Sequence, residues 1–189
     1  MTPLPGSLGK GDVLGWRLDH QRFQATWDSG EGAFKLGGRW NSKGVRAVYA
    51  SIDPSTAILE VAVHKGFRTL DTVRHVLTAF EITDPSKLHV VKIDDIPNAN
   101  WLRPGIPGAG QQQFGDGLLA EHSLFLIPSA VSLHSWNLVF DPGQASGLYK
   151  LHLQEDFALD TRLHPPLRDS AQSERAEGRR PPKPPSAAR

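Results

Sequence analysis

The stretch that decides the fold class is residues 44–65, GVRAVYASIDPSTAILEVAVHK. Residues 47–51 are apolar and strand-forming and are followed by a turn signal, so they predict a β-strand. Asp53 suits the N-cap of a helix, Pro54 suits its first position, and Gly66 stands just past its end. The sequence therefore predicts a strand that leads directly into a helix.

The predicted helix, residues 54–65, is apolar around nearly its whole circumference, which predicts burial on most sides. Glu60 and His64 are four residues apart and therefore share one stripe. A carboxylate on a buried helix is costly unless it is paired or faces a wet cleft. Two interpretations stay open: the two side chains satisfy each other or face solvent, or Glu60 points into a functional cleft.

Short strand-like segments occur on both sides of this stretch. Residues 97–117 are rich in Gly, Pro and Gln and are expected to form a long functional or disordered loop, followed by a short helix over 117–122. Together these segments predict an α+β domain with mainly antiparallel strands and one buried helix. The further strands are expected at residues 13–18, 73–82, 88–93, 124–127, 130–133, 137–140 and 148–153.

Bulk composition is that of an ordinary globular protein. The chain has 189 residues, of which 39% are hydrophobic and 22% charged, with a formal net charge of +1. This charge gives no general case for binding nucleic acid or a membrane. The absence of cysteine excludes disulfides and zinc–thiolate sites. No secretory signal and no membrane-spanning run is present, so we expect a soluble, cytoplasmic protein.

The clearest boundary is near Pro165. Residues 165–189 contain six prolines, six Lys or Arg, three Asp or Glu and no aromatic residue, which predicts a disordered basic tail. The tail is expected to be a solvated terminus, the alternative being contact with nucleic acid or a partner. Residues 12–164 are then the folded domain, and residues 1–11 are an N-terminal extension.

Three residues on consecutive predicted elements are suited to one ligand. Arg39 follows Gly37-Gly38 and can bind a phosphate with two hydrogen bonds, Tyr49 lies on the strand, and Glu60 lies on the helix. Such a set can hold a phosphorylated sugar and stabilise positive charge that develops on it. Taken singly, each has an ordinary alternative: a surface ion pair for Arg39, and half-buried core for Tyr49.

Other chemistries find little support in the sequence. The eight histidines are dispersed and form no His-Glu-x-x-His motif, so no metal site is expected. The Gly30-x-Gly32 pair does not continue as a dinucleotide-binding glycine motif, and no G-x-S-x-G motif is present.

The ordered motifs resemble the RES domain, the toxin half of bacterial RES–Xre type II toxin–antitoxin pairs. The three residues after which the family is named would be Arg39, Glu60 and Ser129. One departure is Asp141-Pro142-Gly143, where the family usually has Asn-Pro-His, and the family's usual tryptophan near residues 115–118 is missing. The resemblance is carried by Trp16-Arg17, Gly37-Gly38-Arg39-Trp40-Asn41, Val48-Tyr49-Ala50-Ser51, Ala57-Ile58-Leu59-Glu60-Val61, Ile127-Pro128-Ser129-Ala130, Asn137-x-x-x-Asp141-Pro142 and Phe157-Ala-Leu-Asp160-x-Arg162-Leu163.

The resemblance implies an ADP-ribosyltransferase-like fold and NAD⁺ as substrate, with no further cofactor. The implied activity is cleavage of the nicotinamide–ribose bond by hydrolysis or phosphorolysis, the alternatives being protein mono-ADP-ribosylation or a non-catalytic nucleic-acid or protein binding module. The implied partners are an Xre-type antitoxin that covers the active site and a second toxin copy, whereas direct nucleic-acid binding is not expected.

The site roles expected on this basis are specific. Arg39 would bind the pyrophosphate and Tyr49 would pack against the nicotinamide half. Glu60 would accept a hydrogen bond from a ribose hydroxyl and stabilise the cation, or activate the nucleophile. Ser129 and Asn137 would bind phosphate or ribose oxygens, and His64 would orient Glu60.

Overall fold

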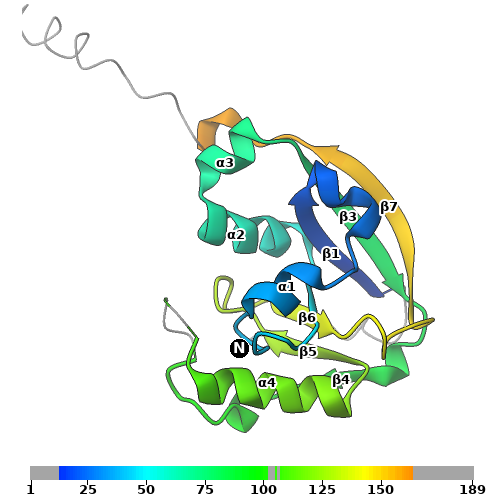
Figure 1. Cartoon of the computed structure of the whole chain (residues 1–189). Coiled ribbons are helices and arrows are strands. Elements are labelled where there is room, and N and C mark those ends of the chain that lie inside the picture. Colours follow the sequence, from blue (N-terminus) through cyan, green and yellow to red (C-terminus); the bar gives the residue numbers. More distant parts are fainter. Residues whose placement is uncertain (1–12, 102–104, 106, 164–189) are drawn as a thin grey trace, which may run out of the picture. The chain divides into compact units, whose positions relative to one another are not determined.

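The computed structural model describes residues 13–101, 105 and 107–163, so the predicted N-terminal extension and basic tail lie outside the described residues. Residues up to Leu159 form one compact unit, and residues from Asp160 belong to a second. The elements, drawn in Figure 1, are β1 (Val13–His20), η1 (Gln21–Thr26), α1 (Glu31–Leu36), β2 (Val48–Ser51), α2 (Pro54–Lys65), α3 (Phe67–Thr72), β3 (His75–Ile82), η2 (Pro85–Lys87), β4 (Leu88–Val90), η3 (Ile93–Asp95), α4 (Ala109–Glu121), β5 (Leu124–Pro128), β6 (Trp136–Phe140), β7 (Tyr149–Phe157) and η4 (Thr161–Leu163).

The described strands form one seven-stranded sheet in the order β4-β5-β6-β2-β1-β3-β7. Only β4 and β5 are parallel, and every other neighbouring pair is antiparallel. The predicted fold class, α+β with mainly antiparallel strands, is confirmed. None of the described helices is long and apolar enough to cross a membrane.

The sheet nearly divides between β1 and β2. Strand β1 pairs with β3 from Val13↔Ile82 to His20↔His75, whereas it meets β2 at the single pair Trp16↔Ser51. Beyond that pair the two strands diverge. The part of the sheet with β2, β4, β5 and β6 and the part with β1, β3 and β7 therefore meet along a narrow seam, and we call this seam the strand divergence.

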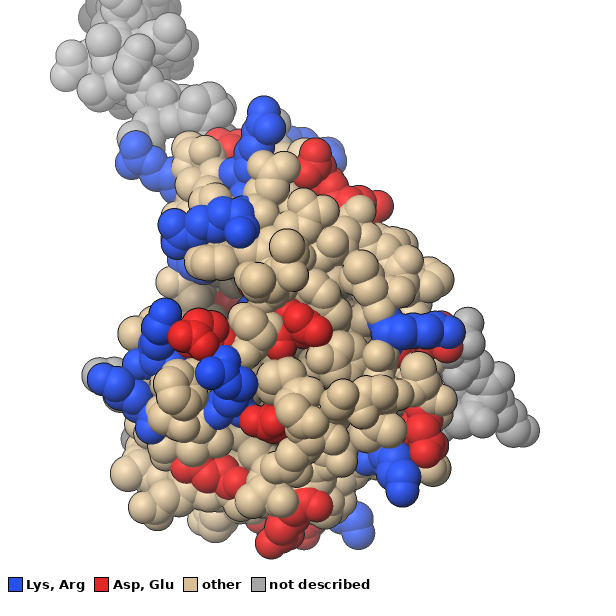
Figure 2. All heavy atoms as spheres, turned by 45° about the vertical axis from the view of Figure 1, so that its right-hand side comes forward, with Lys and Arg blue, Asp and Glu red and all other residues tan. Residues whose placement is uncertain are grey.

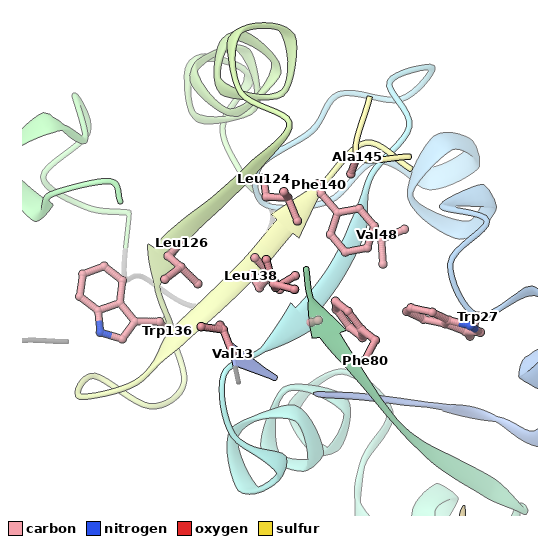
Figure 3. Close-up of a cluster of buried hydrophobic side chains, with 12 residues drawn as sticks. Val13, Trp27, Val48, Phe80, Leu124, Leu126, Trp136, Leu138, Phe140 and Ala145 are labelled. Atoms are coloured by element: carbon pink, nitrogen blue, oxygen red, sulfur yellow. The ribbon is translucent and has the colours of Figure 1, made fainter. Parts of the chain in front are cut away.

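Three apolar clusters hold the elements together. One covers a face of β2, β5 and β6, where Val48, Leu126, Leu138 and Phe140 pack with Phe80 of β3 (Figure 3). A second joins the opposite face of the same strands to α4, and a third joins α2 and α3 to β1 and β3. Strands β5 and β6 are buried along their whole length, because both of their faces are covered.

Helix α2 starts and ends where the sequence predicts. The side chain of Asp53 accepts a hydrogen bond from the backbone N–H of Thr56, and Gly66 follows the last turn with φ 78°. Its predicted burial on most sides is wrong, however, because Leu59 and Val63 are 36% and 60% exposed. The helix therefore covers the sheet with one face only.

Two local predictions also need correction. The expected loop over residues 97–117 is replaced from Ala109 onward by α4, whose last residues are the predicted short helix. Residues 130–133 form a turn and not a strand, since the hydroxyl of Ser129 accepts hydrogen bonds from the N–H groups of Val131 and Ser132. These hydrogen bonds form the turn that reverses the chain between β5 and β6.

Candidate active site

A cavity of about 440 Å³ opens at the strand divergence. Its lining comes from β1, β2, β6, α1, α2, the segment after α1, and two residues before α4, Gly105 and Pro107. Five of the predicted site residues line it: Arg39, Tyr49, Glu60, His64 and Asn137. Ser129 does not, because it is fully buried behind Glu60. Five of the six predicted site residues thus reach the cavity, but the sequence did not predict the depth at which each side chain lies.

Residues 37–40 and Tyr49 line one wall of the cavity, and we call these residues, together with residues 41–45, the loop wall. Asn41 is fully buried and organises it. Its amide Nδ2 donates to the carbonyl oxygens of Ala33, Ser42 and Val45 at 3.0, 3.1 and 2.9 Å. Its Oδ1 accepts the Tyr49 hydroxyl at 2.7 Å. A single asparagine thus ties the segment after α1 to strand β2.

The glycine pair before Arg39 serves this tie. Gly37 has φ 74°, a conformation that favours glycine. A Cβ on Gly38 would lie 2.6 Å from the Tyr49 hydroxyl oxygen, so no larger residue fits there. The glycine pair therefore lets this backbone approach Tyr49 closely.

The Tyr49 hydroxyl is committed to the protein. Besides donating to Asn41 it accepts the N–H of Trp40 at 3.0 Å. Burial raises the pKa of Tyr49 well above its usual value, so the phenol stays neutral at any physiological pH. The tyrosine can offer its ring to the cavity but cannot act as a base.

Arg39 and Trp40 point to different places. The half-buried Arg39 lines the cavity, and its Nη1 donates to the carbonyl oxygen of Trp101 at 2.6 Å. The Trp40 side chain lies in the core beside Trp101 and Phe114. The Gly38 N–H donates to the Asn41 carbonyl oxygen at 2.9 Å. Arg39 therefore lies between this bond and the buried Trp40 side chain, and its guanidinium presents a cationic group to the cavity.

The second wall, which we call the helix wall, is α2 with Glu60. Its start is fixed by Asp53, which accepts the Thr56 N–H at 2.8 Å and the Ser135 hydroxyl at 2.5 Å. Burial alone would raise the pKa of Asp53, but these hydrogen bonds outweigh it and lower the pKa. The cap remains ionised near neutral pH and ties α2 to the chain just before β6.

Glu60 is held by one of its two carboxylate oxygens. Oε1 accepts from Asn137 Nδ2 at 2.6 Å and from the Ser129 hydroxyl at 3.0 Å. Because the Ser129 oxygen already accepts two backbone N–H groups, its own proton is left for Glu60. Among the described residues nothing bonds Oε2, which leaves that oxygen for a ligand in the cavity.

Comparison with known proteins identifies the family. Residues 14–162 match the RES domain family. The chain belongs to the RES domain family. It is 31% identical over 153 residues to "Toxin Res" of Photorhabdus laumondii, covering 78% of this chain and 95% of that protein. It is 31% identical over 133 residues to a "Prs ADP-ribosylating toxin" of Sphingobium sp., covering 67% and 81% of the two chains.

A solved structure supports the fold of this RES domain. The crystal structure of the M. tuberculosis MbcT–MbcA toxin–antitoxin complex contains a chain that matches with a TM-score of 0.57 and 23% sequence identity. The match covers 78% of this chain and 85% of that one. At that identity the likeness concerns the fold alone.

Two predicted roles change in the RES domain described here. His64 is exposed at the cavity, and within the described part of the chain no hydrogen bond joins it to Glu60. The hydrogen bonds that orient Glu60 come from Ser129 and Asn137 instead. Ser129, expected to bind substrate oxygens, lies too deep to line the cavity.

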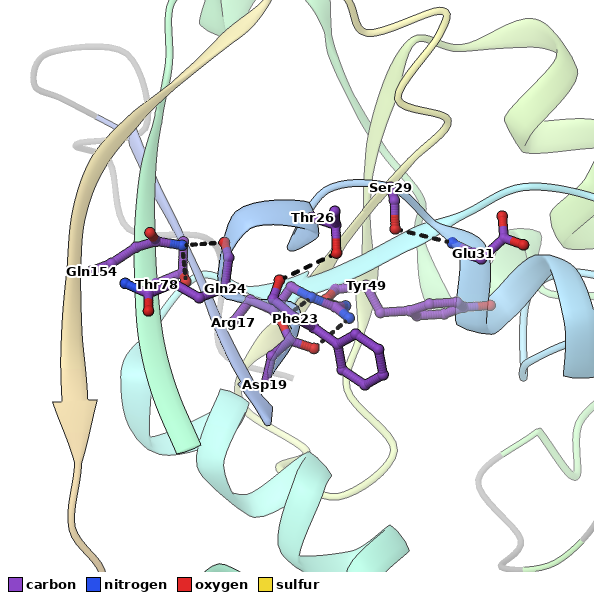
Figure 4. A network of polar contacts seen from close by, with 10 residues as sticks. All are labelled: Arg17, Asp19, Phe23, Gln24, Thr26, Ser29, Glu31, Tyr49, Thr78 and Gln154. Carbon is purple, nitrogen blue, oxygen red and sulfur yellow. Dashed lines mark hydrogen bonds and ion pairs between the residues drawn. The ribbon is translucent and has the colours of Figure 1, made fainter. Parts of the chain in front are cut away.

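Arg17 and Asp19 of β1 were missed as site residues. Both line the cavity, and Figure 4 shows them beside Tyr49. Arg17 Nη1 donates to the Tyr49 carbonyl oxygen at 2.7 Å, and its other nitrogens bond Asp19 at 2.5 and 2.7 Å. The guanidinium thus spans the strand divergence where backbone pairing has stopped. Their i, i+2 spacing could have indicated the pair, because it places both side chains on one face of a strand.

Metal chemistry finds no support in the described side chains. No group of three or more His, Asp or Glu among them is placed to hold a metal ion. The charged groups that line the cavity are instead guanidinium and carboxylate groups together with Lys65. Such groups suit an anionic ligand with hydroxyl groups, such as a phosphorylated sugar.

Proposed function

We propose that this chain is the toxin of a toxin–antitoxin pair and that it consumes NAD⁺ by cleaving the nicotinamide–ribose bond. The observation that carries the proposal is the anchoring of Glu60 by one oxygen in a cavity that also holds Arg39. The cavity, at about 440 Å³, falls within the usual range of small-molecule sites, roughly 300–1,000 Å³. Relatives named as toxins support the biological role.

The reaction needs little covalent help from the protein. When the C–N bond breaks, its electron pair returns to the nicotinamide nitrogen, and the ribose carbon becomes oxocarbenium-like. Arg39 would hold the pyrophosphate with its guanidinium. The open oxygen of Glu60 would accept a ribose hydroxyl and stabilise the developing positive charge. Water or inorganic phosphate would then attack the same carbon, giving ADP-ribose or its phosphate ester.

The Tyr49 ring would pack against the nicotinamide half, since its neutral hydroxyl is already bonded within the loop wall. Asn137 and Ser129 would act by positioning Glu60. His64 and Lys65, both exposed at the cavity, would contact the ligand from the end of α2.

A second candidate is transfer of ADP-ribose to a protein, and it is favoured by the ADP-ribosylating toxin of Sphingobium sp. among the relatives. The two activities share the cleavage step and differ only in the acceptor. A non-catalytic binding module is not favoured. On the face in Figure 2, Lys and Arg are interspersed with Asp and Glu and do not gather in one basic surface.

An antitoxin would be the physiological partner, as in the MbcT–MbcA complex. We propose an Xre-type antitoxin that covers the cavity, with a second toxin copy in the assembly. Purified toxin and antitoxin, mixed and analysed by light scattering, would give the stoichiometry.

The decisive experiment is incubation of the purified protein with NAD⁺ in phosphate-containing and phosphate-free buffers, with products identified by mass spectrometry. Free ADP-ribose in both buffers indicates hydrolysis. An ADP-ribose phosphate ester found only with phosphate indicates phosphorolysis. A mass increase on added cell proteins indicates transfer. Unchanged NAD⁺ under all conditions would refute the proposal, and Glu60→Gln protein serves as the background control.

A further inference from the structure

Ser51 is the last residue of β2 and lies beside the residues that hold Glu60. It is 2% exposed and contributes to the cavity lining. In the antiparallel pairing of β2 with β6 its register partner is Asn137. Its hydroxyl donates to Asn137 Oδ1 at 2.9 Å.

This hydrogen bond decides which way the Asn137 amide faces. An amide oxygen can only accept, so a hydroxyl that donates to it fixes the carbonyl end toward Ser51. The NH₂ end then faces Glu60 Oε1 at 2.6 Å. The reversed amide would set a carbonyl oxygen against a carboxylate oxygen, with no proton between them.

We propose that Ser51 is a positioning residue of the active site that acts through Asn137. By fixing the amide it keeps both donors, from Asn137 and Ser129, on one oxygen of Glu60 and leaves the other open to the ribose. The inference rests on the proposed NAD⁺ cleavage and adds a residue to its machinery. A direct contact between Ser51 and the substrate is the competing explanation, since Ser51 also lines the cavity.

A double-mutant cycle on NAD⁺ cleavage separates the two explanations. Ser51→Ala is expected to lower kcat about two- to tenfold, which corresponds to one net hydrogen bond, with KM little changed. In an Asn137→Ala background the same substitution is expected to change kcat by less than about twofold, because its target is gone. Loss of the same factor in both backgrounds, or a change in KM alone, would overturn the inference.

Two nearly isosteric variants provide the matched control. Ser51→Thr keeps the hydroxyl and Ser51→Val replaces it with a methyl group, while both add the same bulk at a buried strand position. Threonine is expected to retain most of kcat and valine to match alanine. Equal loss in both variants would indicate a packing role and contradict the proposal. Thermal unfolding checks that each variant is folded.

The experiments distinguish failure of the proposed function from failure of the role proposed for Ser51. If the wild-type protein leaves NAD⁺ intact, the proposed function falls and this inference falls with it. If the wild type cleaves NAD⁺ and the cycle is additive, only the role of Ser51 is refuted.

Discussion

The two walls of the cavity use their polar groups in opposite ways. In the loop wall, the Tyr49 hydroxyl and the Asn41 amide bond only to other parts of the protein. In the helix wall, one carboxylate oxygen of Glu60 accepts hydrogen bonds from the protein, whereas the other has no partner among the described residues. The loop wall is thus mainly a scaffold that carries Arg39, whereas the helix wall carries the group that would act on the substrate.

This difference predicts that substitutions in the helix wall change turnover, and that those in the loop wall change stability or binding. The largest effect is expected for Glu60→Gln. The amide is nearly isosteric but carries no charge, so the loss of roughly 3–4 kcal/mol of electrostatic stabilisation should lower kcat about a hundredfold or more. Steady-state NAD⁺ consumption measures this decrease in kcat. The midpoint of thermal unfolding should be the same as that of the wild type.

The matched control is Glu121→Gln, since Glu121 lies at the exposed end of α4, outside the cavity. That variant should retain wild-type turnover. A Glu60→Gln protein that also consumed NAD⁺ at the wild-type rate would remove the distinction between the walls.

The next effect tests the scaffold through a pair of glycines in α4. A Cβ on Gly115 would lie 2.1 Å from the carbonyl oxygen of Trp40, whereas a Cβ on Gly117 meets nothing within 4 Å. Gly115→Ala is expected to cost about 3 kcal/mol of unfolding free energy or more, by overpacking against backbone. Gly117→Ala should instead gain about 0.5–1 kcal/mol from helix propensity. Urea unfolding measures the free energy of unfolding of both variants. Equal free energies would show that α4 does not pack tightly against the loop wall.

Arg39 is the loop-wall residue expected to act on binding. Arg39→Ala removes charge-assisted hydrogen bonds worth about 1.5–3 kcal/mol, so KM for NAD⁺ should rise roughly ten- to a hundredfold with a smaller change in kcat. Arg39→Lys keeps the charge but lacks the planar guanidinium, so its KM for NAD⁺ should lie between those of the wild type and Arg39→Ala. An unchanged KM in Arg39→Ala would exclude the phosphate role.

Tyr49→Phe should destabilise the loop wall. It leaves Asn41 Oδ1 and the Trp40 N–H without their partner, at an expected cost of about 1–3 kcal/mol in unfolding free energy. Tyr149 is the chain's other tyrosine, and within the described ranges its hydroxyl makes a single hydrogen bond, to Asp28. Tyr149→Phe is therefore the control, and a smaller loss is expected from it. If both variants lost equal stability, the Tyr49 hydroxyl would have no special part in the scaffold.

The sequence predicted the ends of α2, because these depend on neighbours along the chain. Asp53, Pro54 and Gly66 are local stop and start signals, and they placed both ends of α2 correctly. The position of Glu60 on that helix followed from the same signals. Helix α4 was mostly missed because its glycines resemble a loop, whereas Gly115 is required by contact with Trp40, which is distant in sequence.

The partners of Glu60 could not be predicted in the same way. Helical spacing suggested His64, the nearest polar neighbour on the same helix. The actual donors are Ser129, which directly follows β5, and Asn137, the second residue of β6; they are 69 and 77 residues away. The position of these donors relative to Glu60 depends on the pairing of β2 with β6. No local sequence pattern predicts the register of that pairing.

The smallest effect concerns the start of β3, a strand that packs with α2, and depends on pH. His75, the first residue of β3, is 1% exposed, and its Nε2 has no partner among the described residues. Burial lowers the pKa of His75 below its usual value of 6.5, and nearby Lys65 and His20 add to that lowering. As the pH falls below about 6.5, the unfolded chain binds a proton that the folded protein does not, so stability decreases with falling pH. Urea unfolding at pH 7.5 and 5.5 should therefore give a smaller decrease for His75→Gln than for the wild type. An equal decrease in both proteins would assign the pH dependence to other groups, such as His89, whose pKa burial also lowers.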